Sequence, residues 1–327
     1  ISRTHKPDFP QPHLYEFQGD LNLRKLFQNI SDSHKVLTVF DIASLKEIFS
    51  KTGRNSWVYF APYLACYSLP PGRPLYLTRK GDSFFLFQHI NGKNSNRIDL
   101  VIPPSILTSD TKTYLSRIKE SLDQSEMRIL WVDSSDVVHL RNIYGDNIHI
   151  EKRENEYIYD PNLVFNLEGG MFRDIRKKIN RVTRKAPIFF QLEKNDVPAA
   201  LEVLGKWRSV QGKKNKFLLD WGYTRAALNS IGDFDTEDLM AWGLEIEKKM
   251  VGFSMAGPIN QNTACFYVAK TVIGINGLSE YLRWKTFGKL RNYKLVNDAS
   301  DLNIDGLKQY KRKFRPLVMN SVYTATI

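Results

Sequence analysis

The sequence has little cysteine and little histidine, and both shortages limit the chemistry that it can carry. Its two cysteines, Cys66 and Cys265, lie far apart and neither belongs to a CxxC motif. This argues against a disulfide framework or a zinc ribbon and fits a reducing compartment. All six histidines lie between His5 and His149. If the chemistry lies in the second half, it uses neither histidine nor a histidine-based metal site.

Long apolar runs are missing as well. No stretch approaches the roughly 18 consecutive apolar residues that indicate a transmembrane helix. We therefore expect a cytoplasmic protein, with peripheral binding at the inner face of the membrane as an alternative. The first residues, ISRTHKPDFPQPH, have neither an initiating Met nor an apolar segment, and we interpret them as a trimmed start.

What the sequence does have is length, apolar residues and positive charge. A chain of 327 residues with 42% apolar residues exceeds one ordinary hydrophobic core, so we predict two domains, 1–155 and 156–327. Residues 1–150 carry 18 Lys and Arg against 15 Asp and Glu, and residues 151–327 carry 29 against 20. Most of the net charge of +12 thus lies in the second half. This asymmetry indicates an anionic partner and carries no information about the fold.

Short strand-like runs alternate with helical patterns along the chain. Helices are predicted at 113–122, 172–185, 275–292 and 305–314, and the polar stretch 151–162 is interpreted as the connection between halves. Strands are predicted at 57–60, 74–77, 84–87, 98–102, 129–132 and 263–270, with a hairpin across 240–257. This mixed order predicts an α/β or α+β protein with mixed sheets flanked by helices.

The predicted helix at 172–185 is strongly basic. It carries seven Lys and Arg and one acid, Asp174, and like charges one turn apart are mildly destabilising. Its basic face includes Arg173, Arg176, Lys177 and Arg181. Either this face is simply solvated, or an anionic partner relieves the repulsion. Nucleic-acid phosphate and an anionic membrane surface both fit, and composition does not separate them.

The region 245–277 has the order of elements found in N-acetyltransferases, namely a hairpin, a strand and then a helix. An acetyl-CoA site in that fold uses an (R/Q)-x-x-G-x-(G/A) loop before the helix to bind the pyrophosphate. The residues here are AKTVIGINGLSEYL, which supply Gly274 and Gly277 without the basic residue or the spacing. The pattern favours an acyl donor other than acetyl-CoA, although the glycines also fit a plain turn and cap.

Several segments resemble one family. They are EYIYDPNLVFNLEGGMFRDIRKKINR, GKWRSVQG, KKMVGFSMAG, INGLSEYLRWKTFGKLR and LVNDASDLNIDGLKQYKRKFRP. Together they are similar to the C-terminal catalytic module of bacterial phosphatidylglycerol lysyltransferases (aminoacyl-phosphatidylglycerol synthases) and their soluble relatives, over about residues 156–320. The most specific piece is G-L-x-x-[FY]-K-x-x-F-x-P, which runs from Gly306 to Pro316.

The resemblance implies two tandem acetyltransferase-like (GNAT-like) domains, of which 156–327 is catalytic and 1–155 is not. It implies an aminoacyl-tRNA as the donor substrate and a phosphatidylglycerol-like headgroup or a small molecule as the acceptor. We expect no metal and no cofactor, and the weak phosphate loop disfavours acetyl-CoA. Because an aminoacyl ester is already activated, such an enzyme mainly aligns the acceptor and stabilises an oxyanion.

Candidate site residues follow from the family motif and its neighbours. Lys311 matches the motif lysine, and we expect its ammonium to contact the 3′-terminal phosphate of the donor or the developing oxyanion. Asp298 and Asp301 could bind a substrate amine or act as base, although Asp301 also fits a turn. Glu280 and Arg283 either form an i,i+3 pair or face the site. The remaining candidates are Tyr310, which is more suited to packing than to reaction, and Lys313, which joins the basic helix in the tRNA or membrane footprint.

Three functions are therefore compatible with the sequence. The first is an aminoacyl-tRNA-dependent aminoacyltransferase. The second is an N-acyltransferase that uses coenzyme A or carrier-protein thioesters, against which the weak phosphate loop counts. The third is a non-enzymatic binder of RNA or of a membrane, which would show steep salt dependence without turnover.

Overall fold

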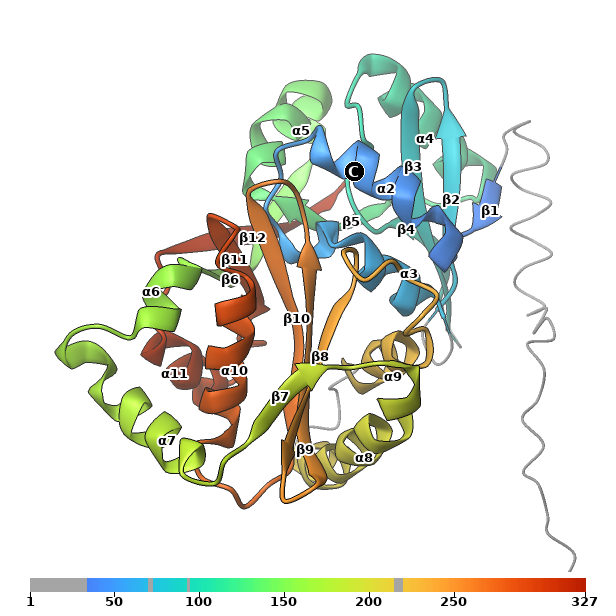
Figure 1. Cartoon of the computed structure of the whole chain (residues 1–327). Helices are drawn as coiled ribbons and strands as arrows, with labels where there is room; N and C mark the ends of the chain where they lie inside the picture. The colour runs from blue at the N-terminus through green and yellow to red at the C-terminus, as the bar shows by residue number, and fades with distance from the viewer. Residues whose placement is uncertain (1–33, 70–72, 93–94, 215–219) are drawn as a thin grey trace, which may run out of the picture.

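The computed structural model describes residues 34–69, 73–92, 95–214 and 220–327, and the strands of these residues form one mixed sheet (Figure 1). Their order across the sheet is β1-β2-β3-β4-β5-β12-β6-β11-β10-β9-β8-β7. Their bounds are β1 His34–Val36, β2 Leu75–Lys80, β3 Ser83–Gly92, β4 Ser95–Leu100, β5 Arg128–Asp133, β6 His149–Tyr159, β7 Ile188–Gln191, β8 Met240–Ile246, β9 Lys249–Pro258, β10 Thr263–Thr271, β11 Leu295–Ser300 and β12 Val318–Thr326.

Helices cover both faces of this sheet. Their bounds are α2 Ile42–Ser50, α3 Ala61–Ser68, α4 Ser109–Ser121, α5 Val137–Tyr144, α6 Pro161–Asn166, α7 Arg173–Thr183, α8 Val197–Lys214, α9 Asp220–Asn229, α10 Leu278–Lys289 and α11 Asp305–Lys313. In the second half, α6, α7, α10 and α11 share one core, whereas α8 and α9 pack on the opposite face together with α2 and α3 (Figure 1). Within the described ranges, no helix has the length and apolar character needed to cross a bilayer.

The two halves repeat one arrangement. Strands β2, β3 and β4 form an antiparallel meander, and β4 then pairs with β5 in parallel after α4. Strands β8, β9 and β10 do the same, and β10 pairs with β11 in parallel after α10. The predicted fold class of tandem, helix-flanked mixed sheets is confirmed.

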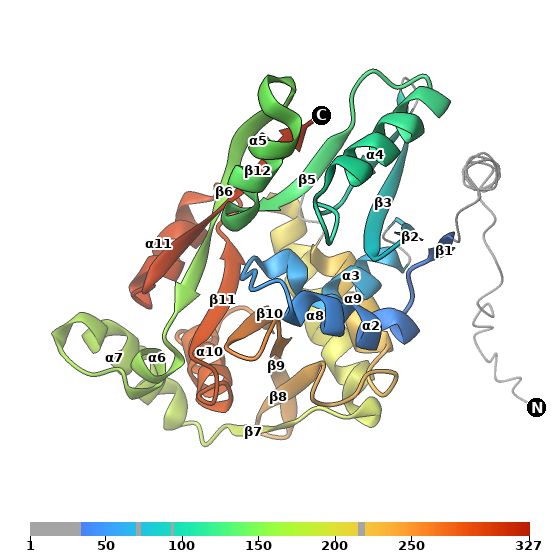
Figure 2. The same cartoon turned by 90° about the horizontal axis from the view of Figure 1, so that it is seen from above.

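The last strand joins the two halves. β12 pairs antiparallel with β5 of the first half on one side and with β6 on the other, and Figure 2 shows it running between them. The interpretation of 151–162 as a connection is therefore wrong, because most of that stretch is β6, a central strand. Its polar residues misled the prediction, since its pairing partners β11 and β12 lie far away in sequence.

Most other elements follow the sequence pattern. The hairpin of β8 and β9 turns at Glu247 and Lys248, whose positive φ angles of 51° and 58° are those of a tight type I′ turn. The predicted strand at 57–60 is wrong, because Trp57–Tyr59 form a single 3₁₀ turn. The backbone N–H groups of Ser56 and Trp57 donate to Asp133 and Glu156 instead of to a neighbouring strand.

A buried carboxylate fixes the middle of the sheet. Glu156 of β6 is 2% exposed, and the backbone N–H of Trp57 donates to it at 3.1 Å. The side-chain amides of Asn297 on β11 and Asn320 on β12 donate to it at 2.7 Å and 3.3 Å. This one side chain thus ties a first-half turn to three adjacent strands. Burial raises the pKa of Glu156 to about 8, although these donors oppose the shift.

The raised pKa of Glu156 predicts a pH-dependent stability. Between its ordinary value of 4.5 and about 8, the folded chain holds a proton that the unfolded chain has released. The free energy of unfolding should therefore fall as the pH rises through this window, by at most about 1.4 kcal/mol per pH unit. Urea unfolding at several pH values should show this slope in the native chain and a flatter one in Glu156→Gln. Identical slopes would contradict the prediction.

Candidate active site

The parallel strands β10 and β11 separate soon after they meet. They pair only over Thr263–Cys265 and Leu295–Asn297, although β10 runs on along β9 and β11 runs on along β6. The residues just past the last pair, Phe266 and Asp298, thus lie where the sheet stops being continuous.

Three buried charged side chains meet at this point. They are Arg283 of α10, Asp298 of β11 and Lys311 of α11, exposed by 5%, 4% and 4%. The guanidinium of Arg283 forms an ion pair with Asp298 Oδ2, and Lys311 Nζ lies 3.4 Å from the same oxygen. The structure therefore brings together three of the residues that the sequence singled out, from three separate elements.

Lys311 holds a strained stretch of β11. Its ammonium donates to the carbonyl oxygen of Asp298 and, at 3.3 Å, to that of Ala299. Ala299 has a φ of 54°, a left-handed conformation that costs a non-glycine residue about 1–2 kcal/mol. Burial lowers the pKa of Lys311, and Asp298 opposes the shift. The ammonium expected to contact substrate is thus engaged by the protein itself in this structure.

Arg283 keeps one donor without a partner. Its guanidinium lies 4.6 Å from the ring centroid of Phe266, 5.3 Å from that of Tyr310 and 5.2 Å from that of Phe314. Among the described residues nothing accepts a hydrogen bond from its buried Nε. A buried donor left unpaired costs about 1–3 kcal/mol, so Arg283 is poised to bind an acceptor oxygen. Burial raises the pKa of Tyr310 to about 12, against the opposing effect of Arg283.

Two further candidates form no ion pair with this cluster among the described residues. Glu280 does not pair with Arg283, because its carboxylate forms an ion pair with Lys178 of α7; the i,i+3 option is wrong. Asp301 accepts from the Tyr157 hydroxyl and, at 2.9 Å, from the backbone N–H of Asn303. Asp301 therefore has the turn-forming contacts that the sequence also allowed.

The basic candidates divide into structural and exposed residues. The guanidinium of Arg176 donates to the carbonyl oxygens of Leu167 and, at 2.7 Å, Gly169, so it holds the loop before α7. The exposed members are Arg173, Lys177 and Arg181 on α7 and Lys313 on α11. These exposed cations remain available to an anionic partner.

The start of α10 is covered by α7. Gly277, the N-cap residue, has a φ of 92°, and a Cβ placed there would lie 2.6 Å from the carbonyl oxygen of Lys178. Gly274 has a φ of 102° but open space around it. Gly277 is thus required by close packing at the helix end where an acetyl-CoA enzyme would bind pyrophosphate.

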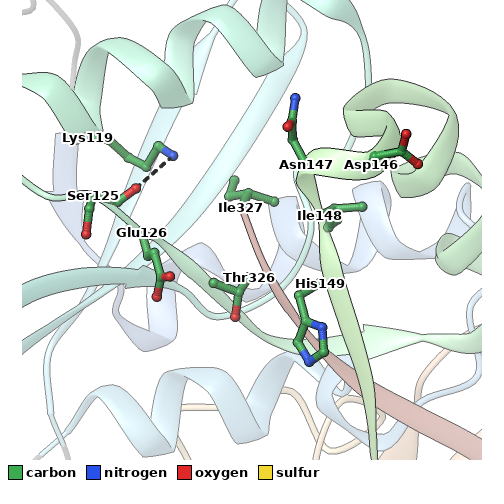
Figure 3. A pocket seen from close by; sticks show the side chains of 9 residues that line it. All are labelled: Lys119, Ser125, Glu126, Asp146, Asn147, Ile148, His149, Thr326 and Ile327. Atoms are coloured by element: carbon green, nitrogen blue, oxygen red, sulfur yellow. Dashed lines mark hydrogen bonds between the residues drawn. The ribbon is translucent and has the colours of Figure 1, made fainter.

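A separate pocket of about 420 Å³ lies at the far end of β6 and β12 (Figure 3). Residues of α4, of the loop between α4 and β5 and of the 3₁₀ turn before β6 complete its wall, and none of the predicted site residues lines it. Its lining is Lys119, Ser125, Glu126, Asp146, Asn147, Ile148, His149, Thr326 and Ile327. Its charged side chains are exposed or half-exposed, so it lacks the buried polar groups found at the β10–β11 separation. Nowhere in the described ranges do three His, Cys, Asp or Glu side chains gather as metal ligands would.

Sequence reasoning missed Glu156, Asn297 and Trp57. The signal for Glu156 was its place directly before the run Tyr157–Tyr159, where a polar strand enters the core. Asn297 and Trp57 carried no signal, because their partners come from distant segments.

The duplicated helix-flanked sheet defines the tandem acetyltransferase-like class of fold. The chain belongs to the family described as phosphatidylglycerol lysyltransferase, C-terminal, whose model matches residues 65–326. The family resemblance seen in the sequence is thereby confirmed. No curated protein matches the chain in sequence.

Solved structures share the fold at low identity. A conserved protein of unknown function from Bacteroides thetaiotaomicron is 18% identical, with a TM-score of 0.77 over 90% of this chain and 99% of that one. L-PGS from Bacillus licheniformis is 16% identical, with a TM-score of 0.63 over 86% and 90%. The C-terminal domain of a putative lysylphosphatidylglycerol synthetase from Agrobacterium fabrum is 14% identical, with a TM-score of 0.59 over 87% and 92%.

The packing of α7 on α10 makes a matched pair of substitutions informative. Gly277→Ala should lower the free energy of unfolding by about 2–4 kcal/mol, because it adds an overlap with Lys178 to the strain of positive φ. Gly274→Ala carries only the strain and should cost about 1–2 kcal/mol. Chemical denaturation of both variants measures the difference, and equal losses would show that α7 does not press on this helix end.

Proposed function

We propose that this protein transfers an aminoacyl group from an aminoacyl-tRNA to a hydroxyl group of a phosphatidylglycerol-like headgroup or of a small-molecule acceptor. The observation that carries the proposal is the buried Arg283–Asp298–Lys311 cluster at the β10–β11 separation, with an unused donor on Arg283. Membership of the phosphatidylglycerol lysyltransferase family supports the same reaction class.

The reaction is an ester exchange and needs neither an oxidant nor a metal. The acceptor hydroxyl oxygen attacks the ester carbonyl carbon, and a tetrahedral oxyanion forms. The bond from that carbon to the terminal ribose oxygen of the tRNA then breaks. The proton lost by the acceptor ends on this ribose oxygen, so atoms and charge balance.

Each member of the cluster has a role in this step. Arg283 would donate from Nε to the oxyanion, since pre-positioned donors in a dry site stabilise developing charge strongly. Asp298 holds the guanidinium in place through its ion pair. Lys311 adds positive charge and fixes the backbone of β11 on which Asp298 stands. Tyr310 packs against Arg283.

The exposed cations of α7 and Lys313 fit the donor's phosphates. Arg173, Lys177 and Arg181 repel one another on one helix, and backbone phosphates of a tRNA would relieve this repulsion. An anionic headgroup surface would act in the same way, which agrees with a cytoplasmic enzyme that works at the inner face of a membrane.

The first test is a transfer assay with a panel of charged tRNAs, offered with lipid extract and with small-molecule extract. Arg283→Lys keeps the charge that pairs with Asp298 but removes the Nε donor, so transfer should fall about 100-fold. Arg54→Lys makes the same change in another buried pair, with Asp136, and should keep transfer while losing stability. If no charged tRNA is a donor, the proposed function is wrong.

A second test separates two roles of Lys311. Lys311→Met should lower transfer on the order of 100-fold. If the ammonium acts by holding the strained backbone, adding Ala299→Gly should raise transfer at least about tenfold above that of Lys311→Met, because glycine adopts positive φ without cost. If the ammonium contacts substrate, the double variant will be as inactive as Lys311→Met. Turnover of both variants under identical conditions decides between the two.

A further inference from the structure

A row of exposed apolar side chains follows the helix that carries Lys311. Leu317, Val318 and Met319 are 62%, 52% and 37% exposed, although a strand with one covered face would bury at least one of three consecutive side chains. Among the described strands, this end of β12 pairs only with β6, because its pairing with β5 begins at Val322. We call Leu317, Val318 and Met319 the apolar edge. Single apolar residues are common on a surface, whereas a contiguous group indicates a contact site.

The apolar edge is continuous with the surroundings of Lys311. Met319 lies opposite Tyr157 of β6 in an antiparallel pair, so their side chains share one face of the sheet. The Tyr157 ring centroid lies 5.6 Å from Lys311 Nζ, and the Tyr157 hydroxyl donates to Asp301. The next residue, Leu302, is itself 49% exposed. A molecule that covers the apolar edge would therefore lie beside the element that holds Lys311.

Exposed cations border the apolar edge. Those on α11 and in the turn that leads to the edge are Lys308, Arg312, Lys313 and Arg315. Burial raises the pKa of Tyr157 to about 12 and Arg312 opposes this shift, so the guanidinium lies near the Tyr157 hydroxyl, on the same face as Met319. In the part of the chain that the structure describes, none of the four cations forms an ion pair with an acid. Like charges at helical spacing repel, and an anionic partner would remove the repulsion.

An anionic bilayer fits the apolar edge and its cations together. Apolar side chains enter the boundary between headgroups and acyl chains, while cations bind the anionic headgroups around them. A nucleic acid would use the cations alone, because it binds through phosphates and through stacking on aromatic rings, which the edge lacks. A second copy of the chain, docked edge to edge about a two-fold axis, would bring the same cations against one another.

We propose that the apolar edge and the cations of α11 form a membrane-docking surface for anionic phospholipid. Leu317, Val318 and Met319 enter the interface of the bilayer, and the cations hold headgroup phosphates around them. Docking there brings headgroup hydroxyls to the side of the molecule that holds Lys311. The inference rests on the proposed function, because it selects a bilayer phospholipid over a small molecule as the acceptor of that same reaction.

The test is co-sedimentation of the full chain with vesicles, in the absence of any tRNA. Vesicles of phosphatidylcholine mixed with phosphatidylglycerol should bind at least about tenfold more tightly than vesicles of phosphatidylcholine alone. Leu317→Ser combined with Val318→Ser should weaken binding to the mixed vesicles about tenfold, since both side chains lose their burial in lipid. Because both are exposed in the free protein, the thermal unfolding midpoint should stay unchanged.

A matched control removes equally exposed apolar side chains elsewhere. Ile188 and Ile273 are 58% and 55% exposed, and Ile188 begins β7, the strand at the opposite end of the second-half sheet. Ile188→Ser combined with Ile273→Ser should therefore leave vesicle binding unchanged. Equal weakening by the two double variants would refute the assignment of the docking surface to the apolar edge.

Three other results would also overturn the proposal. They are no binding to the mixed vesicles, equal binding to both kinds of vesicle, and self-association in sedimentation velocity that Leu317→Ser with Val318→Ser abolishes. The last result would make the edge an interface between copies of the chain. Vesicle binding is measured without a donor, so its failure leaves transfer from tRNA to a small molecule untouched. Vesicle binding without transfer from any charged tRNA would instead uphold the docking surface and refute the proposed function.

Discussion

The hydrogen bonds to Glu156 are the interaction on which the arrangement of the two halves depends. A carboxyl group in the dry centre of a sheet is costly unless donors surround it, and here the donors come from the Trp57 turn, β11 and β12. Each donor belongs to a segment that must stay in register for the network to exist. The polar network therefore fixes how the first half, the last strand and β11 meet.

The same strand links this network to the charged cluster. Asn297 points toward Glu156 and the first half, and Asp298, the next residue, points toward Arg283 and Lys311. The next residue, Ala299, has a left-handed conformation, and Lys311 donates to the carbonyl oxygens of both Asp298 and Ala299. Strain of this kind persists where surrounding contacts over-determine it, and it is common at functional sites.

The spacing of apolar residues was sufficient to predict an element when its hydrogen-bond partners lie close to it in the sequence. The hairpin of β8 and β9 and the amphipathic helices α7 and α11 satisfy their own backbone groups, so their spacing predicted them. The segment 151–162 and the turn at Trp57 were misread because their hydrogen-bond partners lie on β12, β11 and β5. Strand β12 was not predicted for the same reason, since its pairing with β5 and β6 joins residues from opposite ends of the chain.

The sequence alone predicted the fold class and the family, and it named Arg283, Asp298 and Lys311 among its candidate site residues, because motif and element order are local properties. Only the tertiary structure decided what these residues do to one another. In the described part of the chain, Glu280 pairs with Lys178, the ammonium of Lys311 donates to the backbone of β11, and the buried donors Arg283 Nε and Trp57 Nε1 have no acceptor. Whether a polar atom is paired depends on every element that surrounds it, and no spacing along the chain encodes that.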